Sequence, residues 1–231
     1  MSRARSRIAG VISVFGELLI TVGVVLGLFV VYSLWWTNVL ADRESSRQGD
    51  LMREGWKDGR GGGAAGPGSL DTRDGIGFLH VPAMKNGEVL VKKGTDPKKL
   101  NDGIAGYYTK PVKSALPWDA RGNFTLAAHR DGHGAKFHNI HKVKNGDPIV
   151  FETRDTWYVY KVYKSLPETS KYNVDVIDPV PKESGKTKAG RYITLTTCTP
   201  VFTSDYRYIV WGELVREVKV DKDRSKPAEL R

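Results

Sequence analysis

Two hydrophobic patterns divide this 231-residue chain. Near the amino terminus, residues 18–36 include no charged side chain, and about 20 mostly apolar residues suffice for a helix to cross the hydrocarbon layer of a bilayer. Beyond residue 75, short runs rich in Val, Ile, Tyr, Thr and Phe alternate with Gly, Pro, Asn and Asp. The first pattern predicts one membrane-spanning helix, and the second predicts a domain of short β-strands.

The strand-like runs follow one another at short intervals. Helical signal is scarce among them, and only residues 96–107 favour one short helix, because Asp96-Pro97 is a typical N-cap and first turn. Many short strands with few helices are typical of a closed or nearly closed antiparallel β-barrel. The predicted strands are residues 76–82, 88–94, 123–130, 147–153, 156–166, 191–198 and 207–215.

The charges beside the apolar run predict its orientation. Arg3, Arg5 and Arg7 precede the run with no acidic residue among them, and positive charge close to a span is retained on the cytoplasmic side. Trp35 and Trp36 stand at the far end, where aromatic rings favour the membrane interface. A cleaved signal peptide is the alternative, but the apolar stretch exceeds a normal h-region and no clear small-x-small cleavage site follows it. We therefore expect an uncleaved anchor.

The segment between the anchor and the first strand contains GRGGGAAGPGS and many charges. Little of it could pack, so we expect a flexible linker with an rms reach of roughly 30 Å. The charged carboxyl-terminal end is expected to be disordered. The predicted organisation is a cytoplasmic amino terminus over residues 1–7, a transmembrane anchor over 8–40, the linker over 41–74, the barrel over 75–218 and a disordered tail over 219–231.

Charge and cysteine content narrow the function. The net charge of +10 favours attraction to an anionic surface such as a membrane or cell wall. Lys and Arg are scattered rather than striped, which argues against nucleic-acid binding. The single cysteine, Cys198, has no partner for an intramolecular disulfide. Exported proteins often use their cysteines in pairs. An unpaired thiol kept outside the cytoplasm therefore indicates a functional, reactive group.

Cys198 ends a strand-like run and precedes a Thr-Pro exit. A cysteine attacks as the thiolate, which needs a nearby cation or base. Arg207 lies on the next strand and could return beside Cys198 across a hairpin. As a permanent cation with several donors, it could stabilise a thiolate or a developing oxyanion.

Five histidines compete for the role of base. His129 ends a strand-like run, as Cys198 does, and Arg130 after it is expected to be a surface charge on the barrel rim. Four histidines within a short stretch suggest the hypothesis of a zinc site, but no HExxH pattern and no second cysteine support it. We predict no metal ion and no cofactor. His80 is expected to be a packed or edge residue, and the remaining three to be ordinary loop residues: His133, His138 and His141.

The motif TLTTC at residues 194–198, followed by Arg207 and preceded by AHR after an apolar strand, resembles the sortases. These are membrane-anchored cysteine transpeptidases of Gram-positive bacteria, and the resemblance covers roughly residues 75–216. It implies the closed antiparallel eight-stranded sortase-type β-barrel with short helices. It also implies that Cys198 is the nucleophile, His129 the general acid/base, and Arg207 the residue that positions substrate and stabilises the oxyanion.

The resemblance implies a reaction and its partners. Substrates would be secreted proteins with a carboxyl-terminal LPxTG-type sorting signal, cleaved between Thr and Gly through a thioacyl intermediate on Cys198. An amine of a peptidoglycan precursor of the lipid II type would then take the protein. The enzyme would be a single-pass protein of the plasma membrane, with its amino terminus in the cytoplasm and its catalytic domain extracellular. The protonation state of the active Cys198–His129 pair is left open.

The segments TLTTCTPVFTSDYRYIVWGEL and AGYYTKPVKSALPWDARGNFTLAAHR most resemble the class E sortases of actinobacteria, which favour LAxTG over LPxTG. Class A sortases commonly have glycine just before the histidine, where this chain has Ala128. Tyr107 and Tyr108 are candidates to line the pocket for the small second residue of the signal. Thr196 and Thr197, next to the nucleophile, are candidates to contact the substrate.

Three other functions stay open. A cysteine peptidase would hydrolyse the same thioacyl intermediate with water, although papain-like and caspase-like signatures are absent. A non-catalytic anchored barrel would bind wall polymer and merely bury Cys198. A pilin polymerase would use a lysine side chain as acceptor and often carries an aromatic lid, for which the Gly-rich linker offers no obvious candidate.

Overall fold

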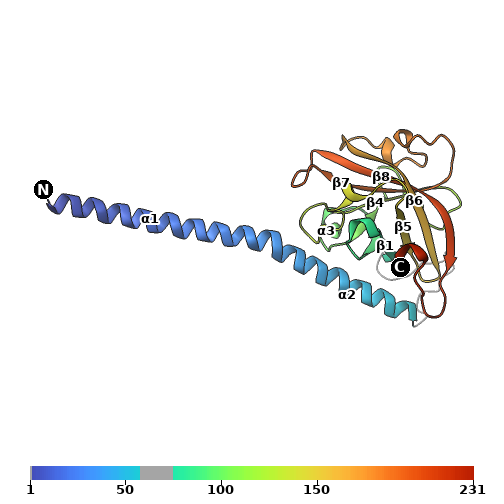
Figure 1. Ribbon diagram of the computed structural model, residues 1–231, viewed down its shortest axis with the longest axis horizontal. Coiled ribbons are helices and arrows are strands. Elements are labelled where there is room, and N and C mark those ends of the chain that lie inside the picture. Colours follow the sequence, from blue (N-terminus) through green and yellow to red (C-terminus); the bar gives the residue numbers. More distant parts are fainter. Residues whose placement is uncertain (1, 58–74) are drawn as a thin grey trace.

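The chain begins with a long helical segment that leads to a barrel (Figure 1). The computed structural model describes residues 2–57 and 75–231. Helix α1 (Ser2–Val31), the π-helical segment η1 (Tyr32–Trp36) and helix α2 (Thr37–Lys57) follow one another without a break. The window Ile12–Val31 is long and apolar enough to cross a membrane, and no other described part of the chain covers it.

Eight strands close the barrel in the order β1-β2-β3-β4-β7-β8-β6-β5. The predicted closed eight-stranded barrel is therefore confirmed. Its pairing is mixed, because β2–β3 and β4–β7 run parallel while the other neighbouring pairs run antiparallel. The strands are β1 (Gly75–His80), β2 (Glu88–Lys93), β3 (Ala105–Tyr107), β4 (Gly122–Ala127), β5 (Pro148–Glu152), β6 (Thr156–Ser170), β7 (Arg191–Thr199) and β8 (Tyr206–Lys219).

The helix expected over residues 96–107 is shorter than predicted. Helix α3 (Pro97–Leu100) begins as expected, because the Asp96 side chain accepts a hydrogen bond from the backbone N–H of Lys98 at 2.9 Å. The chain then turns at Gly103, whose φ of +72° suits glycine. Residues beyond it form β3, a strand too short to show a periodic pattern. Five 3-10 turns complete the described helices: Pro82–Met84, Ile140–Lys142, Asp175–Ile177, Lys182–Ser184 and Ala228–Leu230.

Apolar side chains fill the barrel and cover part of its outside. Alternate residues of the strands point inward, as strand geometry requires, and form one core that includes Phe124, Leu126, Phe151, Tyr160, Ile193, Leu195 and Val210. A second cluster, on the outer face of β8, joins Ile209 and Trp211 to Val176 and Ile177. The Trp211 indole donates to the carbonyl of Val176 at 3.0 Å. Tyr108, on the segment after β3, packs against this outer cluster.

The flexible linker predicted over residues 41–74 is wrong in its first part, which continues helix α2 to Lys57. The buried residues of α2 recur every three or four positions and therefore share one face: Ala41, Ser45, Gly49, Met52 and Trp56. Met52 and Trp56 pack with Phe78, Leu90 and Ile104 of the barrel domain. Residues 58–74, the rest of the predicted linker, lie outside the described residues.

The disordered tail predicted over residues 219–231 is also wrong. Strand β8 continues to Lys219, and the following residues fold back onto the barrel. Val220 and Leu230 pack against the cluster around Trp157, and Glu229 forms an ion pair with Arg216 at 2.6 Å. A composition rich in charge suggested disorder, but specific charge partners order this segment.

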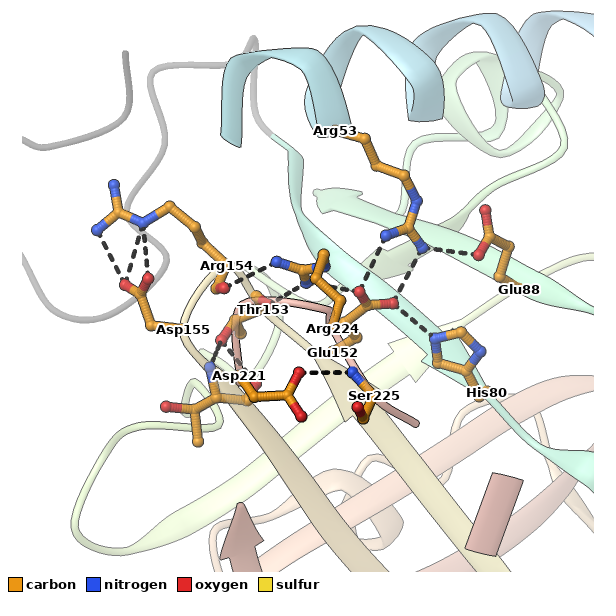
Figure 2. A network of polar contacts seen from close by, with 11 residues as sticks. Arg53, His80, Glu88, Glu152, Thr153, Arg154, Asp155, Asp221, Arg224 and Ser225 are labelled. Atoms are coloured by element: carbon orange, nitrogen blue, oxygen red, sulfur yellow. Dashed lines mark hydrogen bonds and ion pairs between the residues drawn. The ribbon is translucent and has the colours of Figure 1, made fainter. Parts of the chain in front are cut away.

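One buried carboxylate joins helix α2 and the carboxyl-terminal tail to the barrel (Figure 2). Glu152, at the end of β5, is 1% exposed. Its oxygens accept hydrogen bonds from Arg53 of α2 at 2.9 and 3.0 Å and from Arg224 of the tail at 2.6 Å. His80, which is buried on β1 as a packed residue, lies 3.0 Å from the same carboxylate. Burial alone would raise the pKa of Glu152, but the bonds to His80, Arg53 and Arg224 outweigh it and hold the pKa at about 2.

We expect Glu152→Gln to lower the free energy of unfolding by about 3 kcal/mol, because it leaves two guanidinium groups without their buried partner. The folded pKa of about 2 lies below the ordinary 4.5, so the wild-type advantage is fully present above pH 4.5 and is lost as the pH falls toward 2. Denaturant titrations of the full-length protein in detergent at several pH values measure this difference.

The matched control is Glu88→Gln, since Glu88 is exposed and pairs with the same Arg53 at 2.7 Å. An exposed pair contributes at most about 1 kcal/mol. Equal destabilisation by both substitutions, or a wild-type advantage that persists unchanged at acid pH, would contradict the role given to Glu152.

Candidate active site

The parallel pairing of β4 with β7 places His129 and Cys198 at one edge of the barrel. Ala127 of β4 is in register with Thr196 of β7. His129 and Cys198 each lie two residues further on, and parallel strands leave the sheet at the same edge. Because side chains alternate along a strand, both residues share the face of Thr196, opposite to the core residue Leu195.

The antiparallel pairing of β7 with β8 adds Arg207 to the same place. Cys198 and Arg207 are directly opposite each other in the register, and opposed residues of a pair project from the same face. Cys198 is a half-buried free thiol. The structure therefore brings the three predicted catalytic residues to the ends of three neighbouring strands, on the outer face of the barrel.

His129 is held by a residue that the sequence analysis did not single out. Its Nε2 lies 2.8 Å from the side-chain oxygen of Asn101, the residue after α3. A carboxamide oxygen only accepts hydrogen bonds, so Nε2 donates and Nδ1 of the neutral ring is left to take a proton. Asn101 stands 28 residues before His129, and no motif links the two in the sequence.

The surroundings of His129 favour its neutral form. Burial of the ring lowers the pKa of His129 below its ordinary 6.5, and the charge of His133 lowers it further, while Asp131 acts in the opposite direction. The two imidazole rings lie 5.4 Å apart between centroids. His133 was expected to be an ordinary loop residue, and the structure instead places it where it affects the proposed base.

Arg130 is buried and links the ends of two strands. The prediction that it is a surface charge on the barrel rim is therefore wrong. The residue is 6% exposed. Its guanidinium donates to the Cys198 carbonyl at 3.2 Å and to the Thr199 hydroxyl at 2.8 Å. These bonds fix the end of β4, where His129 follows Ala128, against the end of β7 that carries the thiol.

Arg207 is held by the chain around it. Its guanidinium donates to the carbonyl of Ser204 at 3.0 Å and to that of Tyr206 at 2.9 Å. Guanidinium has five N–H donors in a rigid plane. Two backbone bonds therefore orient the group at the start of β8 and leave donor capacity for a carbonyl oxygen beside Cys198.

Tyr108 and Thr196 form a polar contact on the face of Cys198. The Thr196 hydroxyl donates to the Leu126 carbonyl at 3.1 Å and lies 2.9 Å from the Tyr108 hydroxyl, which must therefore donate to it. The Tyr108 ring packs with the outer cluster around Trp211. Burial raises the pKa of Tyr108, so the phenol keeps its proton.

Tyr107 and Thr197, the other two predicted substrate contacts, lie on the opposite face of their strands. Tyr107 pairs with Leu126 and packs against the barrel core. The hydroxyl of Thr197 donates to the Ala128 carbonyl at 2.7 Å. The structure thus separates the four candidates into a pair on the face of Cys198 and a pair directed inward.

One group of side chains among the described residues has the spacing of a metal site, far from Cys198 in the barrel order. Ligand atoms of His80, Glu88 and Glu152 lie within 4.8 Å of one another. The guanidinium of Arg53 already bridges the two carboxylates. A cation there would have to displace a paired arginine, so the donor set does not fit a metal ion.

Comparison with known proteins identifies the family of the chain. Residues 79–215 match the sortase domain model. Sortase SrtE2 of Streptomyces coelicolor is 68% identical over 99% of this chain and 92% of its own length. Sortase SrtE1 of the same species is 46% identical over 94% of this chain and 61% of its own length.

Solved structures similar to this chain are also sortases. The crystal structure of sortase E1 from Streptomyces coelicolor with a tripeptide in the active site is 48% identical, with a TM-score of 0.65 over 68% of this chain and 97% of that one. Sortase E from Streptomyces avermitilis is 33% identical, with a TM-score of 0.60 over the same shares. The eight-stranded barrel, the domain match and relatives over nearly the whole chain lead to one conclusion: this protein belongs to the sortase family of cysteine transpeptidases, with class E sortases among its relatives.

Proposed function

We propose that this sortase cleaves a carboxyl-terminal sorting signal of LAxTG or LPxTG type between Thr and Gly and transfers the protein to an amine of a peptidoglycan precursor. The observation that carries the proposal is the register of three strands, which gathers His129, Cys198 and Arg207 on one face. The partners are secreted proteins with the signal and a lipid II-type precursor. The apolar helix around Ile12–Val31 anchors the enzyme in the plasma membrane, with the amino terminus in the cytoplasm and the barrel extracellular.

The first half of the reaction forms a thioacyl enzyme. Nδ1 of His129 takes the thiol proton as the Cys198 sulfur bonds to the carbonyl carbon of the signal threonine. The carbonyl oxygen becomes an oxyanion, and Arg207 donates to it. The C–N bond to glycine then breaks, and the imidazolium of His129 returns its proton to the leaving amine.

The second half reverses these steps with another amine. The amine of the precursor loses its proton to His129 and attacks the thioacyl carbon. The tetrahedral intermediate expels the Cys198 thiolate and leaves a new amide, and the imidazolium of His129 returns its proton to the thiolate, which restores the enzyme. Asn101 acts as a positioning residue, because its bond to Nε2 keeps Nδ1 of the same ring available in both halves.

The pocket for the second residue of the signal is assigned to Tyr108 and Thr196. Their mutual hydrogen bond holds the Tyr108 ring against the outer cluster, where it fills space that a larger side chain would need. A small alanine fits beside it better than proline does, which favours LAxTG. Tyr107 and Thr197 support this pocket from the inner side of the same strands.

We expect Cys198→Ala to reduce ligation by at least about 1,000-fold, because no other thiol is present to form the acyl intermediate. The assay incubates full-length enzyme in detergent with LAETG-type and LPETG-type peptides and an oligoglycine amine, and mass spectrometry identifies the products. Ligated product from the variant would contradict the role of Cys198. Hydrolysis that added amine leaves unchanged would instead indicate a peptidase.

The pH dependence of kcat/KM tests the base. Because burial and His133 lower the pKa of His129, the acid limb should have its midpoint below pH 6.5, with activity lost as the pH falls through it. Removing the charge of His133 by His133→Gln should raise this midpoint. Asp131→Asn should lower it, since Asp131 raises the pKa of His129. Shifts of the same sign in both variants would rule out this assignment.

Substitution of Tyr108 tests the pocket. Tyr108→Ala opens space beside Thr196 and should raise the kcat/KM of the LPETG-type peptide relative to the LAETG-type peptide by about tenfold, equivalent to about 1.4 kcal/mol. Tyr108→Phe keeps the ring and should preserve most of the wild-type ratio. The pocket assignment fails if Tyr108→Ala reduces both activities equally.

A further inference from the structure

Helix α2 contacts the loop that follows His129. The side-chain oxygen of Asn38 accepts a hydrogen bond from the backbone N–H of Gly134 at 2.8 Å. One turn later, Asp42 pairs with Lys136 at 2.8 Å. The beginning of α2 therefore holds the same loop that carries His133 beside the proposed base.

The same part of α2 packs against the turn that carries Asn101. At Gly103, an added Cβ would come 2.8 Å from the carbonyl oxygen of Ala41. Only glycine allows so close an approach with a φ of +72°. The two segments that hold His129, one through Asn101 and one through the loop at Gly134, thus both rest on the first turns of α2.

These contacts lie close to the end of the apolar helix. Asn38 follows Val31, the last residue of the apolar window, by seven positions, or about 10 Å along a helix axis. Trp35 is 63% exposed between them, at the position where aromatic side chains mark the membrane interface. The catalytic end of the barrel is therefore level with the expected head-group layer.

The opposite end of the barrel lies much further along α2. Arg53, which binds Glu152, follows Val31 by 22 positions, or about 33 Å. Figure 1 shows the barrel alongside α2, with α3 and β7 toward the long amino-terminal helix and β5 and the carboxyl terminus away from it. The two attachments fix which end of the barrel faces the membrane.

An exposed aromatic residue stands on the loop after Cys198. Phe202 is 76% exposed, with a φ of +66°. Its backbone N–H donates to the Asp131 side chain at 2.6 Å, which ties it to the loop that α2 holds. An aromatic ring presented in this way suits the boundary between lipid head groups and acyl chains.

We propose that α2 is a rigid strut that holds the catalytic end of the barrel in the head-group layer of the anchoring membrane, with the Phe202 loop in contact with lipid. The enzyme then acts on chains and amines held at the membrane surface and less well on the same groups held further out. This inference rests on the membrane anchoring in the proposed function, but its first test does not depend on catalysis.

The first test measures energy transfer in lipid nanodiscs. Ser204→Cys and Asp223→Cys, each in full-length protein with Cys198→Ala, carry the same donor fluorophore, and the acceptor sits on lipid head groups. Both positions are exposed, but Asp223 neighbours Arg224 at the level of Trp56. Position 223 should lie about 20 Å further from the membrane, so transfer from position 204 should be at least about twofold higher. Equal transfer, or higher transfer from position 223, would overturn the proposal.

Two neighbouring serines provide a matched pair of variants for the strut. Ser45 is buried on the packed face of α2, and Ser46 is exposed beside it. Ser45→Arg should release α2 and lower the transfer from position 204, whereas Ser46→Arg should leave it unchanged. Unchanged transfer in both variants would show that the docked helix does not set the orientation.

An insertion tests the functional consequence without disturbing the docked face. Eleven helix-forming residues between Thr37 and Asn38 add about three turns, or about 17 Å, and return α2 to nearly the same rotation. Ligation to a soluble oligoglycine should be retained, while ligation to the same amine on a short vesicle-bound lipid tether should fall several-fold. Equal ligation to the tethered amine before and after insertion would overturn the proposal. Loss of soluble ligation in the unmodified enzyme would instead count against the proposed function.

Discussion

The site depends on the parallel pairing of β4 with β7. In a barrel of antiparallel neighbours, the ends of two adjacent strands lie at opposite edges, and a residue after β4 could not meet one at the end of β7. The long connection over residues 128–190 makes the parallel arrangement possible. A register slip of one residue would turn Cys198 into the barrel. The two bonds from Arg130 to the end of β7 oppose such a slip.

Once the register is set, the chemistry follows from burial and a few directed hydrogen bonds. Burial and the charge of His133 lower the pKa of His129, which favours its neutral form, and Asn101 selects the tautomer. Burial also keeps the Tyr108 phenol protonated, so it remains a donor to Thr196. Arg207 is charged in any environment. The proposed base, the proposed nucleophile and a fixed cation thus lie on one face of the barrel.

The sequence was sufficient to predict features that repeat along the chain or that combine into a motif. Strand runs with turn residues between them predicted the barrel, and the combination of TLTTC, Arg207 and the upstream histidine identified the candidate catalytic residues. These signals are local, and each strand carries its own pattern. Strand β3 was missed because three residues are too few to show alternation.

Features that depend on contacts between distant segments were not predictable. Ala41, Ser45 and Gly49 form most of the packed face of α2, but small residues do not register as a hydrophobic stripe, so the helix looked like a solvated linker. Arg130 looked like a surface charge because its acceptors are on another strand. The tail looked disordered for the same reason, since the partners of Arg224 are more than 60 residues away.

Helix α2 is attached to the barrel at two points, and only the two together fix the orientation of the barrel relative to the helix. A single contact between α2 and the barrel would leave the barrel free to tilt about it. Contacts at Asn38 and at Arg53 are 15 residues apart, or about 22 Å on a helix axis, and together they fix the tilt. The contact at Asn38 holds the loop after His129. The contact at Arg53 is made with Glu152, whose buried charge is also paired with Arg224. In the proposed arrangement, helix geometry rather than the length of a flexible chain therefore sets the height of the candidate site above the membrane.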